Sequence, residues 1–161
     1  MEIEILNANI DLLGVVVATV ANIVVGMLWF GPLMGAKWMA LVGKTKDQLE
    51  AKPMDYAYSI LIGFTTALFL AFFIYYAGVA GGVGELIKQA PDFNGILYGT
   101  ANKYVGATIV ALMVWVGFVV TSSANLVVWE GRNKMLFLLN IAHHLLSLVV
   151  MALVYALFIE A

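Results

Sequence analysis

The amino-acid sequence predicts an all-α integral membrane protein, a bundle of four transmembrane helices paired as antiparallel hairpins in a single membrane domain, residues 1–161. The chain is 63% hydrophobic and only 11% charged, whereas a soluble domain is about 45–50% apolar and about 25% charged. Four stretches of 25, 29, 26 and 25 residues lack Asp, Glu, Lys and Arg. Each exceeds the roughly 20 residues that a helix needs to cross the hydrocarbon core. Helices are expected because a span in lipid must satisfy its backbone groups internally.

The elements follow from these stretches in order, with spans at about 12–34, 56–78, 104–128 and 135–158. Pro32 is expected to kink or end the first span, and Thr45 with Gln48 to cap a short helix in the loop that follows. The glycine-rich segment 79–103 is predicted to be a flexible connector, with a short surface helix around 85–89 or a lid as alternatives. Only six residues separate the last two spans, which predicts a tight antiparallel hairpin.

The distribution of Lys and Arg predicts the orientation. The loops after spans one and three hold six basic residues, whereas the opposite side holds two: Lys37, Lys44, Lys46, Lys52, Arg132 and Lys134 against Lys88 and Lys103. Basic loops favour the cytoplasm. We therefore expect a multi-pass protein of the cytoplasmic (inner) membrane with both termini on the non-cytoplasmic side. The acidic start of the chain also indicates that the first span is retained rather than cleaved as a signal peptide.

Composition argues against several function classes. The chain has no cysteine, which excludes disulfides and thiol chemistry, and its net charge of −2 does not favour nucleic acid. No Asp or Glu lies within a span, and we find no catalytic motif. We therefore expect a non-enzymatic protein without a cofactor, whose first partner is the lipid bilayer.

Small residues recur at four-residue spacing on the first two spans. Such stripes allow helix backbones to approach closely in membranes. They predict a compact bundle and association into a homo-oligomer. The residues assigned to self-association are Gly14, Ala18 and Gly26 on span one, and Gly63, Ala67 and Ala71 on span two.

Span four carries a polar stripe in an otherwise apolar helix. Asn140, His143, His144 and Ser147 fall on one side of a helical wheel, and this side is expected to face the bundle interior. The histidines lie roughly 14–15 Å from Lys134 along the helix axis, which is close to the membrane midplane.

Polar residues on other spans are candidates for the same cluster. Thr121 and Asn125 on span three lie at similar depth, and Asn22 on span one could join them. Aromatic and charged residues are expected to form a cytoplasmic mouth above the cluster: Trp29, Trp38, Trp129, Glu130 and Arg132.

The cluster admits two main interpretations. It could bind or conduct a small polar solute, an ion or a proton, because ionisable groups inside membranes tend to be functional and histidine titrates near neutral pH. Alternatively, the protein is a structural or accessory subunit whose polar stripe holds helices together. A metal site is disfavoured, because adjacent residues on a helix diverge by about 100° and no other His or Cys could complete the ligand set.

Two segments resemble the domain-of-unknown-function 1761 family of small four-span membrane proteins. "GMLWFGPLMGAKWM" at 26–39 is similar to the family's G-x-L-W-Y-S-P-L-x-F-G-x-x-W signature, and "LVVWEGRNKMLFLLNIAHHLLSLVVMALV" at 126–154 is similar to its C-terminal region. Gly31 stands where the family often has Ser, and His143 where it often has Tyr. The resemblance implies the four-span fold and no established activity. The matching positions are Trp29, Pro32, Gly35, Trp38, Glu130, Gly131, Arg132, Asn140, His144 and Ser147.

Overall fold

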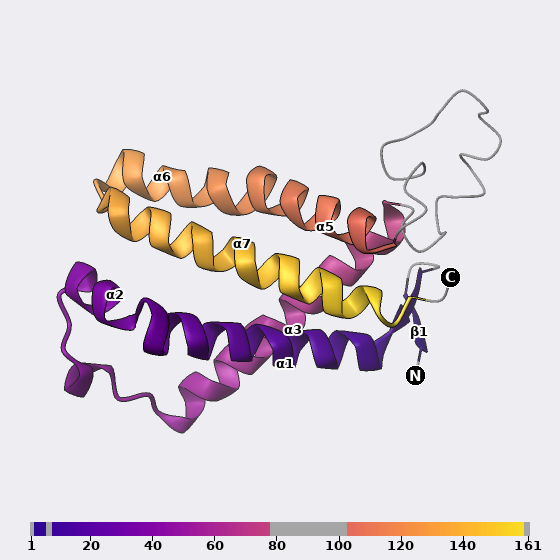
Figure 1. Cartoon of the computed structure of the whole chain (residues 1–161), viewed down its shortest axis with the longest axis horizontal. Coiled ribbons are helices and arrows are strands. Elements are labelled where there is room, and N and C mark those ends of the chain that lie inside the picture. The colour runs from indigo at the N-terminus through magenta and orange to yellow at the C-terminus, as the bar shows by residue number, and fades with distance from the viewer. Residues whose placement is uncertain (1, 6–7, 78–102, 160–161) are drawn as a thin grey trace.

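The computed structural model describes residues 2–5, 8–77 and 103–159, which form helices and one small pair of strands (Figure 1). A π-helical turn extends the first helix, and another joins α5 to α6. In chain order the elements are β1 (Glu2–Ile5), β2 (Ala8–Asp11), α1 (Leu12–Leu28), η1 (Trp29–Leu33), α2 (Gly35–Val42), η2 (Lys46–Leu49), α3 (Pro53–Tyr76), α5 (Lys103–Val114), η3 (Trp115–Val120), α6 (Thr121–Glu130) and α7 (Lys134–Ala156).

Four continuous helical segments are long and apolar enough to cross a membrane, which confirms the four predicted spans. They are Leu12–Leu33, Pro53–Tyr76, Lys103–Glu130 and Lys134–Ala156. The second begins three residues earlier than predicted, because Pro53 suits the first turn of a helix and the Asp55 carboxylate accepts from the backbone N–H of Lys52 at 2.8 Å. The predicted connector at 79–103 and its short helix at 85–89 lie almost wholly outside the described residues.

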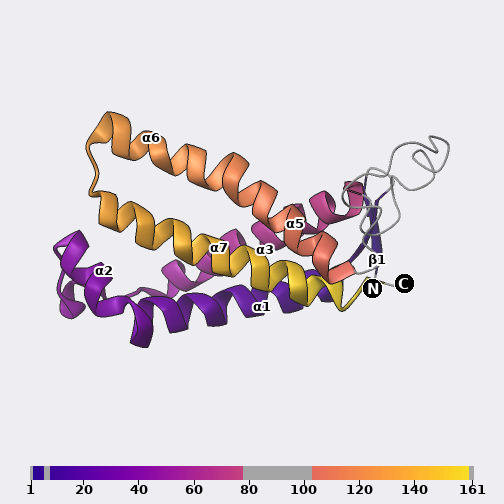
Figure 2. The ribbon, with the colours of Figure 1, turned by 45° about the horizontal axis from the view of Figure 1, so that its top comes forward.

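Helix α7 occupies the middle of the bundle. In both ribbon views α1 lies along one side of it and the α5–α6 segment along the other, while α3 crosses behind (Figures 1 and 2). The α1–α3 and α6–α7 connections meet at one end of the molecule, and β1 lies at the other. We call the first the basic end, because it carries Lys37, Lys44, Lys46, Lys52, Arg132 and Lys134, and the second the terminal end.

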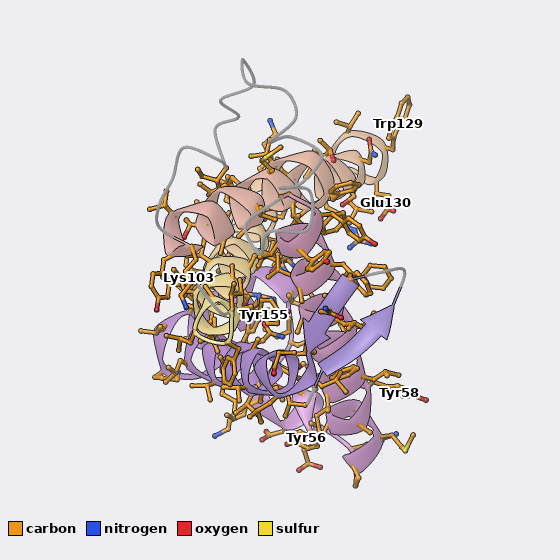
Figure 3. The ribbon with its side chains drawn as sticks, turned by 90° about the vertical axis from the view of Figure 1, so that its right-hand side faces the viewer. Tyr56, Tyr58, Lys103, Trp129, Glu130 and Tyr155 are labelled. Carbon is orange, nitrogen blue, oxygen red and sulfur yellow. The ribbon has the colours of Figure 1, made fainter. Side chains whose placement is uncertain are left out.

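The hydrophobic core is concentrated toward the terminal end. Small residues dominate it, so the helices approach closely there. Tyr155 points into this packed region (Figure 3) and is only 5% exposed. The other members include Val15, Ala18, Ala67, Ala71, Ile74, Ala107, Ala111, Met151, Ala152 and Ala156.

The small-residue stripes pack helices of the same chain against each other. A Cβ placed on Gly14 would lie 2.9 Å from Phe158 Cβ, and one on Gly63 would lie 3.1 Å from Asn22 Nδ2. Ala18, Ala67 and Ala71 are at most 2% exposed. Of the residues assigned to self-association, Gly14, Ala18, Gly63, Ala67 and Ala71 are therefore buried within one chain and are not available to a second copy, whereas Gly26 is only partly buried. Self-association itself stays a prediction.

The two strands at the N-terminus were not predicted. They pair antiparallel, with Glu2 opposite Asp11 and Ile5 opposite Ala8. Ala8 and Ile10 are fully buried, so β2 closes the terminal end of the core. The alternation of Ile with Glu at 2–5 is the period-two pattern of a strand, and it was the available signal. Asp11 ends β2 and caps α1 by accepting from the Gly14 N–H at 2.7 Å.

The predicted break near Pro32 and the predicted loop helix are both confirmed. Gly31 leaves the helical conformation at φ −93° and ψ −108°, and the chain restarts as α2, because proline cannot donate the next helical hydrogen bond. In the loop, the Gln48 side chain caps η2 by accepting from the backbone N–H of Thr45 at 3.0 Å, at the predicted pair of residues. The break brings α2 against α7 at the basic end, which positions the aromatic residues described below.

Candidate functional site

The hairpin between spans three and four is antiparallel but not tight along its whole length, which corrects the prediction. The indole Nε1 of Trp115 donates to the Ile141 carbonyl on α7 at 2.7 Å. From there toward the basic end α6 diverges from α7, as Figure 2 shows. Gly131, at φ +65°, ends α6 in the left-handed conformation that suits glycine. The divergence leaves a groove between the two helices.

This groove, the α6–α7 groove, has a cavity volume of about 200 Å³. One wall comes from α6, the other from α7, and the turn between them closes the basic end. Its lining combines apolar walls with several polar groups: Ser123, Leu126, Val127, Arg132, Asn133, Leu136, Phe137, Asn140 and His144.

Three polar side chains in the groove lack partners. Thr121 and Ser122, just outside it, direct their hydroxyls back to carbonyls of their own helix. In contrast, Ser123, Asn140 and His144 form no side-chain hydrogen bond with any residue of the described ranges; Ser123 and Asn140 are half-buried and His144 is exposed, so their polar atoms open onto the groove. A polar group in an apolar environment is costly unless it is hydrogen-bonded. The groove is therefore a place where water or a solute would satisfy these groups.

Arg132 and Glu130 lie at the basic end of the groove. The Arg132 Nε and Nη2 atoms both contact Glu130 Oε2 at 2.8 Å. Both side chains are about half-exposed, at 55% and 51%, so the pair contributes little to stability. Of these two residues only Arg132 lines the groove. Trp129 projects away from the protein (Figure 3) and is 82% exposed.

His143 faces α1, about 100° around α7 from His144, and the two imidazole rings still touch edge to face, with 5.3 Å between their centroids. Its ring centroid lies 4.7 Å from that of Phe30 and 6.1 Å from that of Trp29, and Nε2 lies 3.4 Å from Ser147 Oγ. Phe30 also packs edge-on against Trp38 at 5.5 Å. We call Trp29, Phe30, Trp38 and His143 the aromatic cluster. Trp29 Nε1 is a buried donor without a hydrogen-bond partner in the described part of the chain.

The predicted polar stripe therefore divides into two environments. Asn140 and His144 line the α6–α7 groove, while His143 and Ser147 face α1. The physical reason is that adjacent helical residues point about 100° apart and α7 has neighbours on both sides. The expectation of a single interior-facing stripe was wrong.

The remaining predicted site residues are dispersed. Thr121 and Asn125 are exposed on α6 and do not line the groove. Asn22 lies against Gly63 of α3. Sequence reasoning overlooked Ser123 and Asn133; the available signals were the Thr-Ser-Ser run at 121–123 and the helix-capping preference of Asn. Among the described residues, no three His, Cys, Asp or Glu side chains gather as a metal site would require.

Replacing His143 with phenylalanine should change the free energy of unfolding by less than about 1.5 kcal/mol, because a ring of similar size keeps the contacts with Phe30 and Trp29. Alanine at the same position should cost about 2 kcal/mol or more, since it removes those contacts. Denaturation of the detergent-solubilised variants, followed by circular dichroism, measures both. Equal losses for the two variants would instead assign the stabilisation to the polar contact with Ser147.

Four apolar spans and a polar groove at the basic end define a multi-pass α-helical membrane protein. The chain matches the family described as "Protein of unknown function (DUF1761)" over residues 13–156, and it belongs to this family. This match confirms the resemblance seen in the sequence. No curated protein and no solved structure matches the chain.

Proposed function

We propose that this protein is a non-enzymatic, multi-pass protein of the cytoplasmic membrane that binds a small polar solute in the α6–α7 groove. The basic end faces the cytoplasm in this proposal, and both termini lie on the other side. The support is the concentration of Lys and Arg in the two loops at the basic end, because short basic loops are retained in the cytoplasm.

The observation that carries the proposal is the set of unpartnered groups in the groove. Ser123, Asn140 and His144 line a cavity of about 200 Å³, and their side chains form no hydrogen bond with any residue that the structure describes. Several water molecules would fill this volume, at about 30 Å³ each. A groove that serves only to hold helices together would instead be expected to pair these groups across the interface.

Binding is favoured over conduction by the packing of the terminal half. Apolar residues of α1, α3 and α7 are almost fully buried there, among them Val15, Ile74 and Met151. A solute that enters from the basic end would meet this core beyond His144. Binding is also favoured over catalysis, because the lining contains no carboxylate that could orient His144.

The alternative function is that of a structural or accessory subunit. It is favoured by the second polar environment, where His143 contacts Ser147 and the aromatic cluster, and by Asn22 packed against α3. These contacts fit helix association. The two functions differ in one measurable property, the hydration of His144.

The hydration of His144 can be measured directly, because the chain has only two histidines and each ring gives its own signal. In histidine-labelled protein in bilayers, nuclear magnetic resonance can measure magnetisation transfer from water to each imidazole ring, with His143→Phe and His144→Phe assigning the signals. We expect rapid transfer to His144 and slow transfer to His143, which serves as the internal control. Transfer equally slow for both rings would reject a solute-binding groove and favour the structural function.

A further inference from the structure

We infer that the solute of the α6–α7 groove is an oxyanion, a phosphate group held by Arg132 at the basic end and by neutral donors along the groove. This inference rests on the proposed function and specifies its ligand. The first argument is charge: Arg132 is the only residue of the lining with a permanent charge, and no Asp or Glu contributes to it. Once an anion displaces the Glu130 carboxylate from Arg132, such a lining favours anions over cations.

The guanidinium of Arg132 retains donors for a ligand. Its Nε and Nη2 atoms contact a single oxygen, Glu130 Oε2, whereas a guanidinium has five N–H donors in a planar fork. This fork matches the oxygens of a phosphate. Glu130, outside the lining, competes for the same guanidinium and is half-exposed, so a bound anion could displace it at small cost.

The neutral residues supply further donors. Asn133 uses its Oδ1 to cap α7, accepting from the N–H groups of Met135 at 2.8 Å and Leu136 at 3.3 Å. Its amide NH₂ remains a donor. Asn140, His144 and Ser123 contribute an amide, an imidazole and a hydroxyl that form no side-chain hydrogen bond within the described part of the chain. Donor groups thus line the groove from its basic end inward.

Size and position agree with this ligand. A cavity of about 200 Å³ accommodates a phosphate with several waters, at about 30 Å³ for each water. Arg132 lies at the end of two spans, the depth at which phospholipid headgroups meet protein. The same chemistry could therefore come from a soluble phosphate or from the headgroup of an anionic lipid, and the test must separate these sources.

The test follows the His144 ring signal of the full chain in a maltoside detergent, which contains no phosphate. One arm adds inorganic phosphate and the other adds phosphatidylglycerol. We expect at least one arm to shift the His144 signal saturably and by more than the His143 signal, since the His143 ring faces α1 and meets the groove only through its edge contact with His144 at 5.3 Å. Arg132→Gln should weaken that binding about tenfold or more, since it removes a charged hydrogen-bond donor.

Two matched variants complete the design. Lys134→Gln removes the same charge from a neighbouring residue outside the lining, and it should change binding by less than about twofold, because exposed charges are screened. Glu130→Gln should tighten binding, since it removes the competitor of the ligand. A shift only with free phosphate identifies a soluble ligand, and a shift only with lipid identifies a headgroup; both support the inference.

Two results would overturn the inference and leave the solute-binding groove in place: a hydrated His144 that responds to neither probe, or equal weakening by Arg132→Gln and Lys134→Gln. A His144 ring that water does not reach would overturn the proposed function as well. The hydration measurement therefore separates failure of the ligand assignment from failure of the groove.

Discussion

Replacing Trp115 with alanine is expected to lower the free energy of unfolding by about 3–5 kcal/mol, the range for removing a large buried aromatic side chain. The indole is partly buried against the core and donates to the Ile141 carbonyl at 2.7 Å, so the lower end of this range, about 3 kcal/mol, is expected. Trp115→Phe separates the two contributions: it keeps most of the ring and should lose about 1 kcal/mol, typical of a hydrogen bond between membrane helices. Denaturation in detergent, followed by circular dichroism, measures both.

The same substitution should affect the groove, because Trp115 joins the two helices where the groove begins. Without this link α6 is free to shift against α7, and the His144 ring signal should broaden or divide. Trp129→Ala is the matched control: this tryptophan is 82% exposed, so its loss should change stability by no more than about 0.5 kcal/mol. Similar effects of the two substitutions would show that Trp115 does not fix the spacing of α6 and α7.

Replacing Gly35 with alanine is the second prediction with a large effect. A Cβ at this position would lie 2.3 Å from the Phe30 carbonyl oxygen. Backbone must therefore move at the junction of η1 and α2. We expect a loss of about 3 kcal/mol, the upper part of the range for overpacking, together with a shift of the His143 ring signal as Phe30 leaves its present contact at 4.7 Å.

Gly117→Ala provides the control for this experiment. Gly117 lies in η3, and a Cβ there would meet no atom within 4 Å. Alanine should be neutral or stabilise the protein by up to about 1 kcal/mol, because glycine is a poor helix former. If Gly35→Ala and Gly117→Ala had the same free energy of unfolding, the backbone at the α1–α2 junction would accommodate a Cβ without strain. The aromatic cluster would then not depend on glycine at this position.

Helix positions followed closely from the sequence because hydropathy and charge spacing are local properties. The four spans, the break at Pro32 and the cap at Thr45 each depend on a few neighbouring residues, and each is confirmed. The strands at Glu2–Ile5 and Ala8–Asp11 are short. The acidic residues of the first strand were used only to argue against a cleaved signal peptide, and the alternation of Glu with Ile was not considered. Their stability depends on burial of Ala8 and Ile10 against helices distant in sequence.

The sequence placed Asn140, His143, His144 and Ser147 on one side of a helix but could not identify the helices beside them. Asn140 and His144 were predicted as one stripe with His143 and Ser147, since a helical wheel gives only directions around one axis. Which direction faces which helix depends on where α1, α5 and α6 lie around α7. Thr121 and Asn125 have the depth that the sequence indicates but face away from the groove, because the rotation of α6 about its axis is set by packing.

The sequence by itself determined the class of the protein, the number of spans and the placement of polar groups within them, because the bilayer imposes length and polarity on each segment separately. Tertiary structure decided that the two histidines have different surroundings. Close packing near the terminal end, the link from Trp115 to Ile141 and the divergence of α6 place His144 in a groove and His143 among aromatic rings. These outcomes depend on contacts between residues far apart in the chain, which no local pattern specifies.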